Sequence, residues 1–158
     1  MVKCKFAVLI LSICLVLLVS GSFAGIWPSY DSQFTCLMEE GYGLGIRVQA
    51  ALDRIDTTQA DYTTGRELRS LLREQRELAD RAYVLWDQNP NKLSAFWYYQ
   101  SVTCTELSVS ATINFTERRG GATLALGAMD VGIAEMRAAV AALESAGVAR
   151  NLEKLQGQ

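Results

Sequence analysis

Apolar residues recur every three or four positions in four separate stretches of the chain, which is the spacing of a helix face that packs against a core. These stretches predict helices over about residues 33–56, 64–87, 90–117 and 123–155. Short polar segments separate them, and no segment longer than a turn alternates with the period of a strand. The pattern therefore predicts an all-α fold: an antiparallel up-down four-helix bundle preceded by an N-terminal hydrophobic export segment.

The third stretch is expected to be the central helix of the bundle, because Glu106 is its only charged residue between Lys92 and Glu117. Its main apolar stripe consists of Leu93, Phe96, Trp97, Gln100, Cys104, Leu107, Ala111 and Phe115. A second apolar face consists of Ala95, Tyr98, Val102, Val109 and Ile113. A helix that is apolar on two sides is either surrounded by neighbours or offers its second face to a partner.

Local signals mark several helix ends. Asn89 is expected to be the N-cap of the central helix, with Pro90 at the first helical position. Thr64 and Glu67 match a capping box at the start of the second helix. The segment from Arg118 to Gly121 places cations and then glycines at the end of the central helix, where each is favourable.

The last stretch has a heptad pattern. Its positions alternate by four and three in a series of apolar residues that ends at a glycine: Leu126, Met129, Ile133, Met136, Val140, Leu143 and Gly147. This spacing predicts a packed seam with alanines beside it. In the first helix, Gly41 and Gly45 are one turn apart and are expected to let a neighbouring helix approach closely.

The second helix carries a basic stripe along its polar face, at Arg66, Arg69, Arg73 and Arg76. Carboxylates four residues away, as in the pairs Arg73–Glu77 and Arg76–Asp80, neutralise these cations locally. The stripe is therefore expected to be a solvated helix surface rather than a binding track for anions.

The beginning of the chain is typical of an export signal. Lys3 and Lys5 form its basic start, and Phe6 to Val19 form its apolar core. Ser22-Phe23-Ala24 is a small-x-small cleavage site that would release Gly25.

The expected organisation is a signal peptide at 1–24 and a single helical-bundle domain at 25–158, secreted or otherwise outside the cytoplasm, in a periplasm or at a cell surface. The alternative is an uncleaved anchor, because Phe6 to Trp27 is long enough to cross a bilayer as one helix. In an exported protein, Asn114 of the sequon Asn114-Phe115-Thr116 is a candidate for glycosylation.

Cleavage changes the charge and the cysteine count. Removing Lys3 and Lys5 from fifteen basic residues leaves thirteen against seventeen acidic ones, a net charge of about −4. This balance argues against nucleic acid as a partner, and against a membrane except through an uncleaved N-terminal segment. Cys36 and Cys104 remain, and in an oxidising compartment they predict one disulfide; the alternative is two unpaired, buried thiols.

Several catalytic chemistries lack their residues. The chain contains no histidine, which removes the imidazole base, histidine-ligated haem and most zinc sites. It has no Cys-x-x-Cys motif, and its acidic residues show no evident pair for acid–base catalysis. The chain is therefore expected not to be an enzyme and to use no cofactor or metal.

Two functions remain open. The first is an interaction or structural module that self-associates or binds a protein partner through the second face of the central helix, at Tyr98, Val102, Val109 and Ile113. The second is a bundle that binds a small apolar ligand in a pocket lined by Trp86, Trp97, Tyr98 and Tyr99. Residues 96–99 span about 300° of a helix, so Tyr98 and Tyr99 are expected to lie off the main stripe that contains Trp97.

Overall fold

The computed structural model describes residues 28–56 and 58–156. Within these residues the chain forms four helices and no strand. The helices are α2 (Tyr30–Leu52), α3 (Tyr62–Gln88), α4 (Leu93–Thr116) and α5 (Ala122–Gln156). The predicted all-α class is confirmed, whereas the expected export segment lies outside the described residues.

The chain divides into two compact units, residues 1–33 and 34–158. Of the first unit the structure describes residues 28–33, where α2 begins. There the Gln33 side chain donates to the Pro28 carbonyl at 2.7 Å, and the Ser32 amide donates to the Ser29 hydroxyl. The second unit contains the remainder of α2 and the other three helices, and the packing described below belongs to it.

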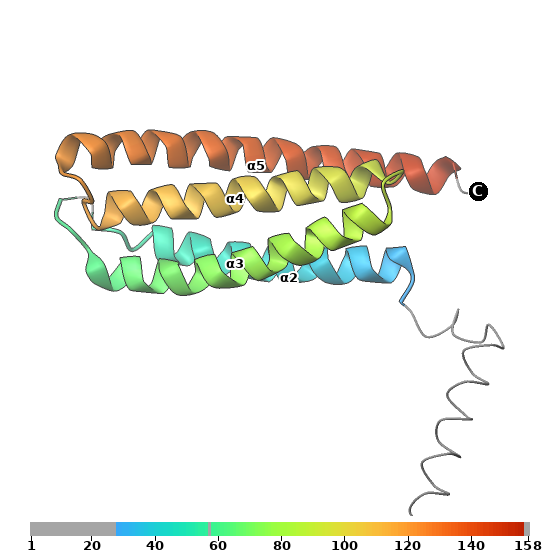
Figure 1. The fold of residues 1–158 in the computed structure, drawn as a ribbon, viewed down its shortest axis with the longest axis horizontal. Helices are drawn as coiled ribbons and strands as arrows, with labels where there is room; N and C mark the ends of the chain where they lie inside the picture. The colour runs from blue at the N-terminus through green and yellow to red at the C-terminus, as the bar shows by residue number, and fades with distance from the viewer. Residues whose placement is uncertain (1–27, 57, 157–158) are drawn as a thin grey trace, which may run out of the picture. The chain divides into compact units, whose positions relative to one another are not determined.

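Ion pairs show that α2 and α3 are antiparallel. Glu40 pairs with Arg81 at 2.6 Å, Arg47 with Glu74 at 2.5 Å, and Arg54, just after α2, with Glu67 at 2.6 Å. Each step of seven residues forward on the first helix is a step of seven backward on the second, as in a heptad register. Exposed pairs of this kind contribute only about 0.2–1 kcal/mol each, so they specify the register more than the stability. Figure 1 shows the helices lying side by side, each running opposite to the one before it.

The helix α4 is central, as predicted. It packs against α3 and α5, and the Tyr98 hydroxyl donates to the Leu37 carbonyl of α2 at 2.5 Å. The face that the sequence analysis gave as the second apolar face is buried, however: Tyr98, Val102, Val109 and Ile113 all lie in the core. On the expected main stripe, Leu93, Trp97 and Leu107 are exposed. The second face therefore belongs to the core, and two of these four residues, Tyr98 and Val102, also line a pocket.

Small residues form the contact between α4 and α5. Ser101 and Ser108 are buried, and their hydroxyls donate to the Ala139 carbonyl at 2.8 Å and the Gly132 carbonyl at 2.7 Å. Seven-residue steps of α5 present Ala125, Gly132, Ala139 and Ala146 at this contact, all of them buried. Because no side chain larger than a methyl group lies on this face of α5, the two helices come close enough for hydroxyl-to-backbone bonds.

The sequence predicted that the heptad residues of α5 are packed in the bundle, and this prediction is wrong. The larger residues of that heptad pattern, which we call the α5 stripe, are Leu126, Met129, Ile133, Met136, Val140 and Leu143. All except the half-buried Met136 are exposed, Leu126 to 57 % and Val140 to 51 %. Large side chains between α4 and α5 would hold the two backbones apart and break the hydrogen bonds of Ser101 and Ser108. The face of α5 that carries alanine and glycine therefore packs against α4 instead.

Two helix starts differ from the prediction. Asp61, rather than Thr64, caps α3: its carboxylate accepts the Thr64 amide at 2.9 Å, while its own amide donates to the Thr116 carbonyl. Asn89 ends α3 instead of starting α4, because its side chain donates to the Leu85 carbonyl at 2.8 Å. The helix α4 begins at Leu93. The amide and the hydroxyl of Ser94 donate hydrogen bonds to Glu153 of α5.

The connection between α4 and α5 is anchored by a buried acid. Glu117 is ion-paired with Arg69 of α3 and with Arg119, so its charge is compensated where water is excluded. The two glycines expected at the end of this helix have positive φ, 77° at Gly120 and 92° at Gly121. They let the chain reverse direction at the end of α4.

The expected disulfide is also wrong. Cys36 and Cys104 are both free thiols. Cys36 is exposed on α2 and donates to Glu40, which pairs with Arg81 of α3. Cys104 instead hydrogen-bonds Glu135 of α5, and burial is the first cause of the raised pKa of its thiol. The two side chains therefore point toward different helices.

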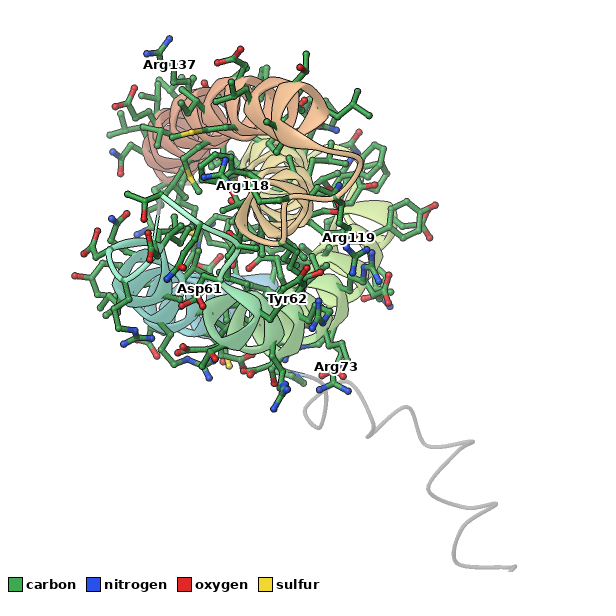
Figure 2. All side chains as sticks on the ribbon, turned by 90° about the vertical axis from the view of Figure 1, so that its left-hand side faces the viewer. Asp61, Tyr62, Arg73, Arg118, Arg119 and Arg137 are labelled. Atoms are coloured by element: carbon green, nitrogen blue, oxygen red, sulfur yellow. The ribbon has the colours of Figure 1, made fainter. Side chains whose placement is uncertain are left out.

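The arginines of α3 are exposed at Arg66, Arg73 and Arg76, as expected, and Figure 2 shows Arg73 pointing away from the bundle. Their pairing differs from the prediction. Arg76 bonds Glu106 of α4 at 2.9 Å, rather than a carboxylate of its own helix. This ion pair joins α3 to α4.

Gly41 and Gly43 offer a matched test of the α2–α4 contact. A Cβ atom on Gly41 would lie 2.5 Å from the Tyr98 hydroxyl, whereas one on Gly43 would meet nothing within 4 Å. We expect Gly41→Ala to lower the free energy of unfolding by about 1–3 kcal/mol through overpacking. Gly43→Ala should raise it by about 0.5–1 kcal/mol because alanine is the better helix former. Urea denaturation of both variants checks this, and equal effects would contradict the close approach.

Ala139 and Ala138 test the α4–α5 contact in the same way. Ala139 is buried under Ser101, whereas the adjacent Ala138 is exposed. We expect Ala139→Leu to destabilise the protein by about 1–3 kcal/mol, since leucine separates the helices. Ala138→Leu should change the free energy of unfolding by less than about 0.5 kcal/mol. A reversed order of the two variants would show that α5 packs through a different face.

Candidate functional site

An apolar groove lies between α2 and α5, over α4. It contains a larger pocket of about 370 Å³ and a smaller one of about 250 Å³, and Met136 lines both. Figure 2, which looks along the helices, shows α4 next to α5 and a wider separation between α5 and α2. The groove therefore lies where α2 and α5 flank α4 without packing closely against each other.

Each side of the groove comes from one helix. Met38, Tyr42 and Ile46 line it from α2, and Met136, Val140 and Leu143 line it from α5. Tyr98 and Val102 of α4 form its floor. At the smaller pocket Met129 and Ile133 continue the α5 side. Gly45 also lines the groove, and a Cβ there would meet nothing within 4 Å, so the expected close helix contact does not exist at this glycine.

The polar groups that line the groove are already hydrogen-bonded within the protein. In the larger pocket the Gln75 side chain donates to the Val102 carbonyl, and the Thr105 hydroxyl donates to the Ser101 carbonyl. The side chains of Gln49, Tyr98, Ser101, Ser108 and Thr112 are donors in the same way. Apart from the exposed Tyr42, the groove therefore offers a ligand mainly apolar surface.

Charged residues follow the outer edge of the α5 stripe. Asp130, Arg137 and Glu144 recur every seven residues, one position after Met129, Met136 and Leu143. All three are exposed, and Figure 2 shows the Arg137 side chain extending away from the bundle. A heptad of apolar residues bordered by a heptad of charges is the surface that a coiled-coil helix presents to a partner helix.

The structure does not bring the four predicted aromatic residues into one pocket. Only Tyr98 lines the groove. Trp86 stacks on Tyr99 with ring centroids 5.5 Å apart and meets the edge of Phe96, so these rings join α3 to α4. Trp97 lies beside a separate depression near the end of α5. Consecutive positions on a helix diverge by about 100°, which separates these side chains.

Tyr98 is the electrostatically perturbed group of the groove floor. Burial raises the pKa of its phenol well above the ordinary value, the nearby Glu40 carboxylate raises it further, and the Arg81 guanidinium opposes this. The neutral phenol therefore stays a hydrogen-bond donor to α2 across the physiological pH range. Its role is to position α2 against α4.

Across 28–56 and 58–156, no group of three or more histidine, cysteine or acidic residues is placed to hold a metal ion. In that part of the chain no helix is both long enough and apolar enough to cross a membrane. Nor does any buried side-chain nitrogen or oxygen there lack a hydrogen-bond partner.

Comparison of the chain with protein-family models, with curated proteins and with solved structures finds no match. A function is therefore inferred from the groove and the α5 stripe alone. The sequence contains a signal for the packed faces of α4 and α5. The serines at 94, 101 and 108 and the small residues at 125, 132, 139 and 146 share one seven-residue period, which favours them as the packed faces.

The raised pKa of Tyr98 predicts a loss of stability at high pH. In the unfolded chain a tyrosine ionises near pH 10, whereas the buried Tyr98 stays protonated to higher pH. Its contribution to stability is complete below about pH 10 and is lost above it, by up to about 1.4 kcal/mol per pH unit. Urea denaturation between pH 8 and 11.5 should show this slope, which Tyr98→Phe should lack. The same slope in both proteins would contradict the burial of Tyr98 as its cause.

Proposed function

We propose that the protein is an exported, non-catalytic interaction module that binds an amphipathic helix in the groove between α2 and α5. The observation that carries the proposal is the α5 stripe: large apolar side chains that are exposed along one edge of a groove whose floor is also apolar. A monomer rarely exposes a contiguous patch of this kind unless it contacts something. Export is supported by the sequence of residues 1–24.

The shape and composition of the groove favour a helix as the occupant. The stripe from Leu126 to Leu143 is about 26 Å long at 1.5 Å per residue, which matches several turns of a partner helix. Amphipathic helices bind such grooves by inserting residues at heptad spacing. Met38, Met129 and Met136 line the groove, and methionine adapts to irregular apolar partners.

A small apolar ligand is the second candidate. The larger pocket alone, at about 370 Å³, is in the size range of ligand sites. Specific small-molecule sites also provide placed polar groups that orient the ligand. Here those groups bond to the protein's own backbone and side chains, so the groove is better suited to side chains held on a helix.

A peptide-binding experiment tests the proposed function. The probe is a designed 25-residue amphipathic peptide with leucine at heptad positions a and d and a fluorophore at its N-terminus. Fluorescence anisotropy should show saturable binding to the full-length protein. Val140→Glu should weaken this binding at least about tenfold, because it places a charge on the groove side of α5.

Val148→Glu is the matched control. Val148 is the same residue type on the same helix and is 62 % exposed, but it lines the separate depression beside Trp97. The control should bind the peptide as the unchanged protein does. Equal weakening by both variants, or no binding at all, would contradict the groove as the site. Tight binding of an apolar dye that the peptide cannot displace would favour the small-ligand function instead.

A further inference from the structure

We infer that the helix bound in the groove is α5 of a second copy of the same chain, in an antiparallel homodimer; this inference rests on the proposed function. Among the helices that the structure describes, α5 is the one that exposes large apolar residues at heptad spacing along its length. It is therefore both one side of the groove and a helix of the kind that the groove fits.

The α5 stripe is complementary to itself when reversed. If two copies of α5 are placed antiparallel with the centre between Ile133 and Met136, each of these residues lies opposite the other in the second copy. Met129 then lies opposite Val140, and Leu126 lies opposite Leu143. Every residue of the stripe has an apolar partner in this register, so both stripes are covered along their full length.

The charges at the edge of the stripe select the same register. In it, Asp130 of each copy lies beside Arg137 of the other, which forms two equivalent ion pairs. A shift of one heptad toward the C-terminus of α5 would place Arg137 beside its own symmetry mate and Asp130 beside Glu144. Like charges in these positions disfavour that arrangement. The apolar and the charged positions thus agree on one arrangement.

A further shift in the same direction pairs Arg137 with Glu144 but disrupts the apolar match. Ile133 would then lie opposite Arg150, and Met129 would lie opposite Lys154. The first register is therefore the one in which both the apolar and the charged positions are satisfied. In a dimer of this kind Tyr42 and Ile46 of α2, both exposed on the other side of the groove, are placed to cover the flank of the incoming helix.

Charge reversal tests the ion pairs. Analytical ultracentrifugation over a concentration series should show a reversible monomer–dimer equilibrium for the full chain. Asp130→Arg and Arg137→Asp should each raise the dimer dissociation constant about tenfold, because each variant replaces two opposite-charge contacts with two like-charge contacts. The double variant should return it to within about threefold of the unchanged protein. Failure of the double variant to recover would overturn the proposed register.

Disulfide trapping tests the direction of the pairing. In a background with Cys36→Ser and Cys104→Ser, a mixture of the Leu126→Cys and Leu143→Cys variants should form a crosslinked heterodimer on mild oxidation. Neither variant alone should crosslink in the antiparallel arrangement, because Cα atoms more than 7 Å apart cannot be bridged without backbone movement. Crosslinking of Leu143→Cys with itself would indicate parallel pairing and overturn the inference.

The peptide probe separates this inference from the proposed function. Apart from the half-buried Cys104, all substituted positions are exposed, and circular dichroism of each variant checks that the helices are retained. A chain that stays monomeric at every concentration but binds the amphipathic peptide would overturn the homodimer and leave the helix-binding function intact. A chain that neither dimerises nor binds the peptide would overturn both. If the homodimer is correct, the Arg137→Asp variant should bind the peptide more tightly than the unchanged protein at the same concentration, since a larger fraction of its grooves is free.

Discussion

The close contact between α4 and α5 determines how the rest of this bundle is exposed. Hydroxyl groups of Ser101 and Ser108 reach backbone carbonyls of α5, and this is possible only because the facing positions are glycine and alanine. A helix has one face toward each neighbour. Once α5 uses its small residues for α4, its large residues must lie elsewhere. The exposed α5 stripe is thus a direct consequence of the inner contact.

The same contact explains the groove. The other side of α4 packs on α2 and α3, where Tyr98 bonds to α2 and ion pairs hold α2 against α3 in one heptad register. The helix α5 lies against α4 and does not close over α2. Apolar side chains from both helices therefore border a space that residues 28–56 and 58–156 leave unfilled, and the proposed partner helix would fill it.

The proposed interaction surface has a physical advantage. The large residues that would bind a partner are not needed for the folding of the monomer, because the α4–α5 contact is made by other positions. Substitutions in the α5 stripe can therefore change the affinity or the partner at little cost to the fold. The half-buried Met136, which lines both pockets, is the exception.

The sequence alone determined the helix count, the approximate helix bounds and the central place of α4, because apolar periodicity and short polar connections act locally. It could not decide which face of α4 or α5 is buried. Both helices are apolar on more than one side, so periodicity allows several orientations, and the choice was made by the serine-to-backbone bonds and the close approach of two helices. The separation of Cys36 from Cys104 follows from that choice. Whether a residue in a bundle is buried depends on which neighbouring helix packs against it, and only the tertiary structure decides this.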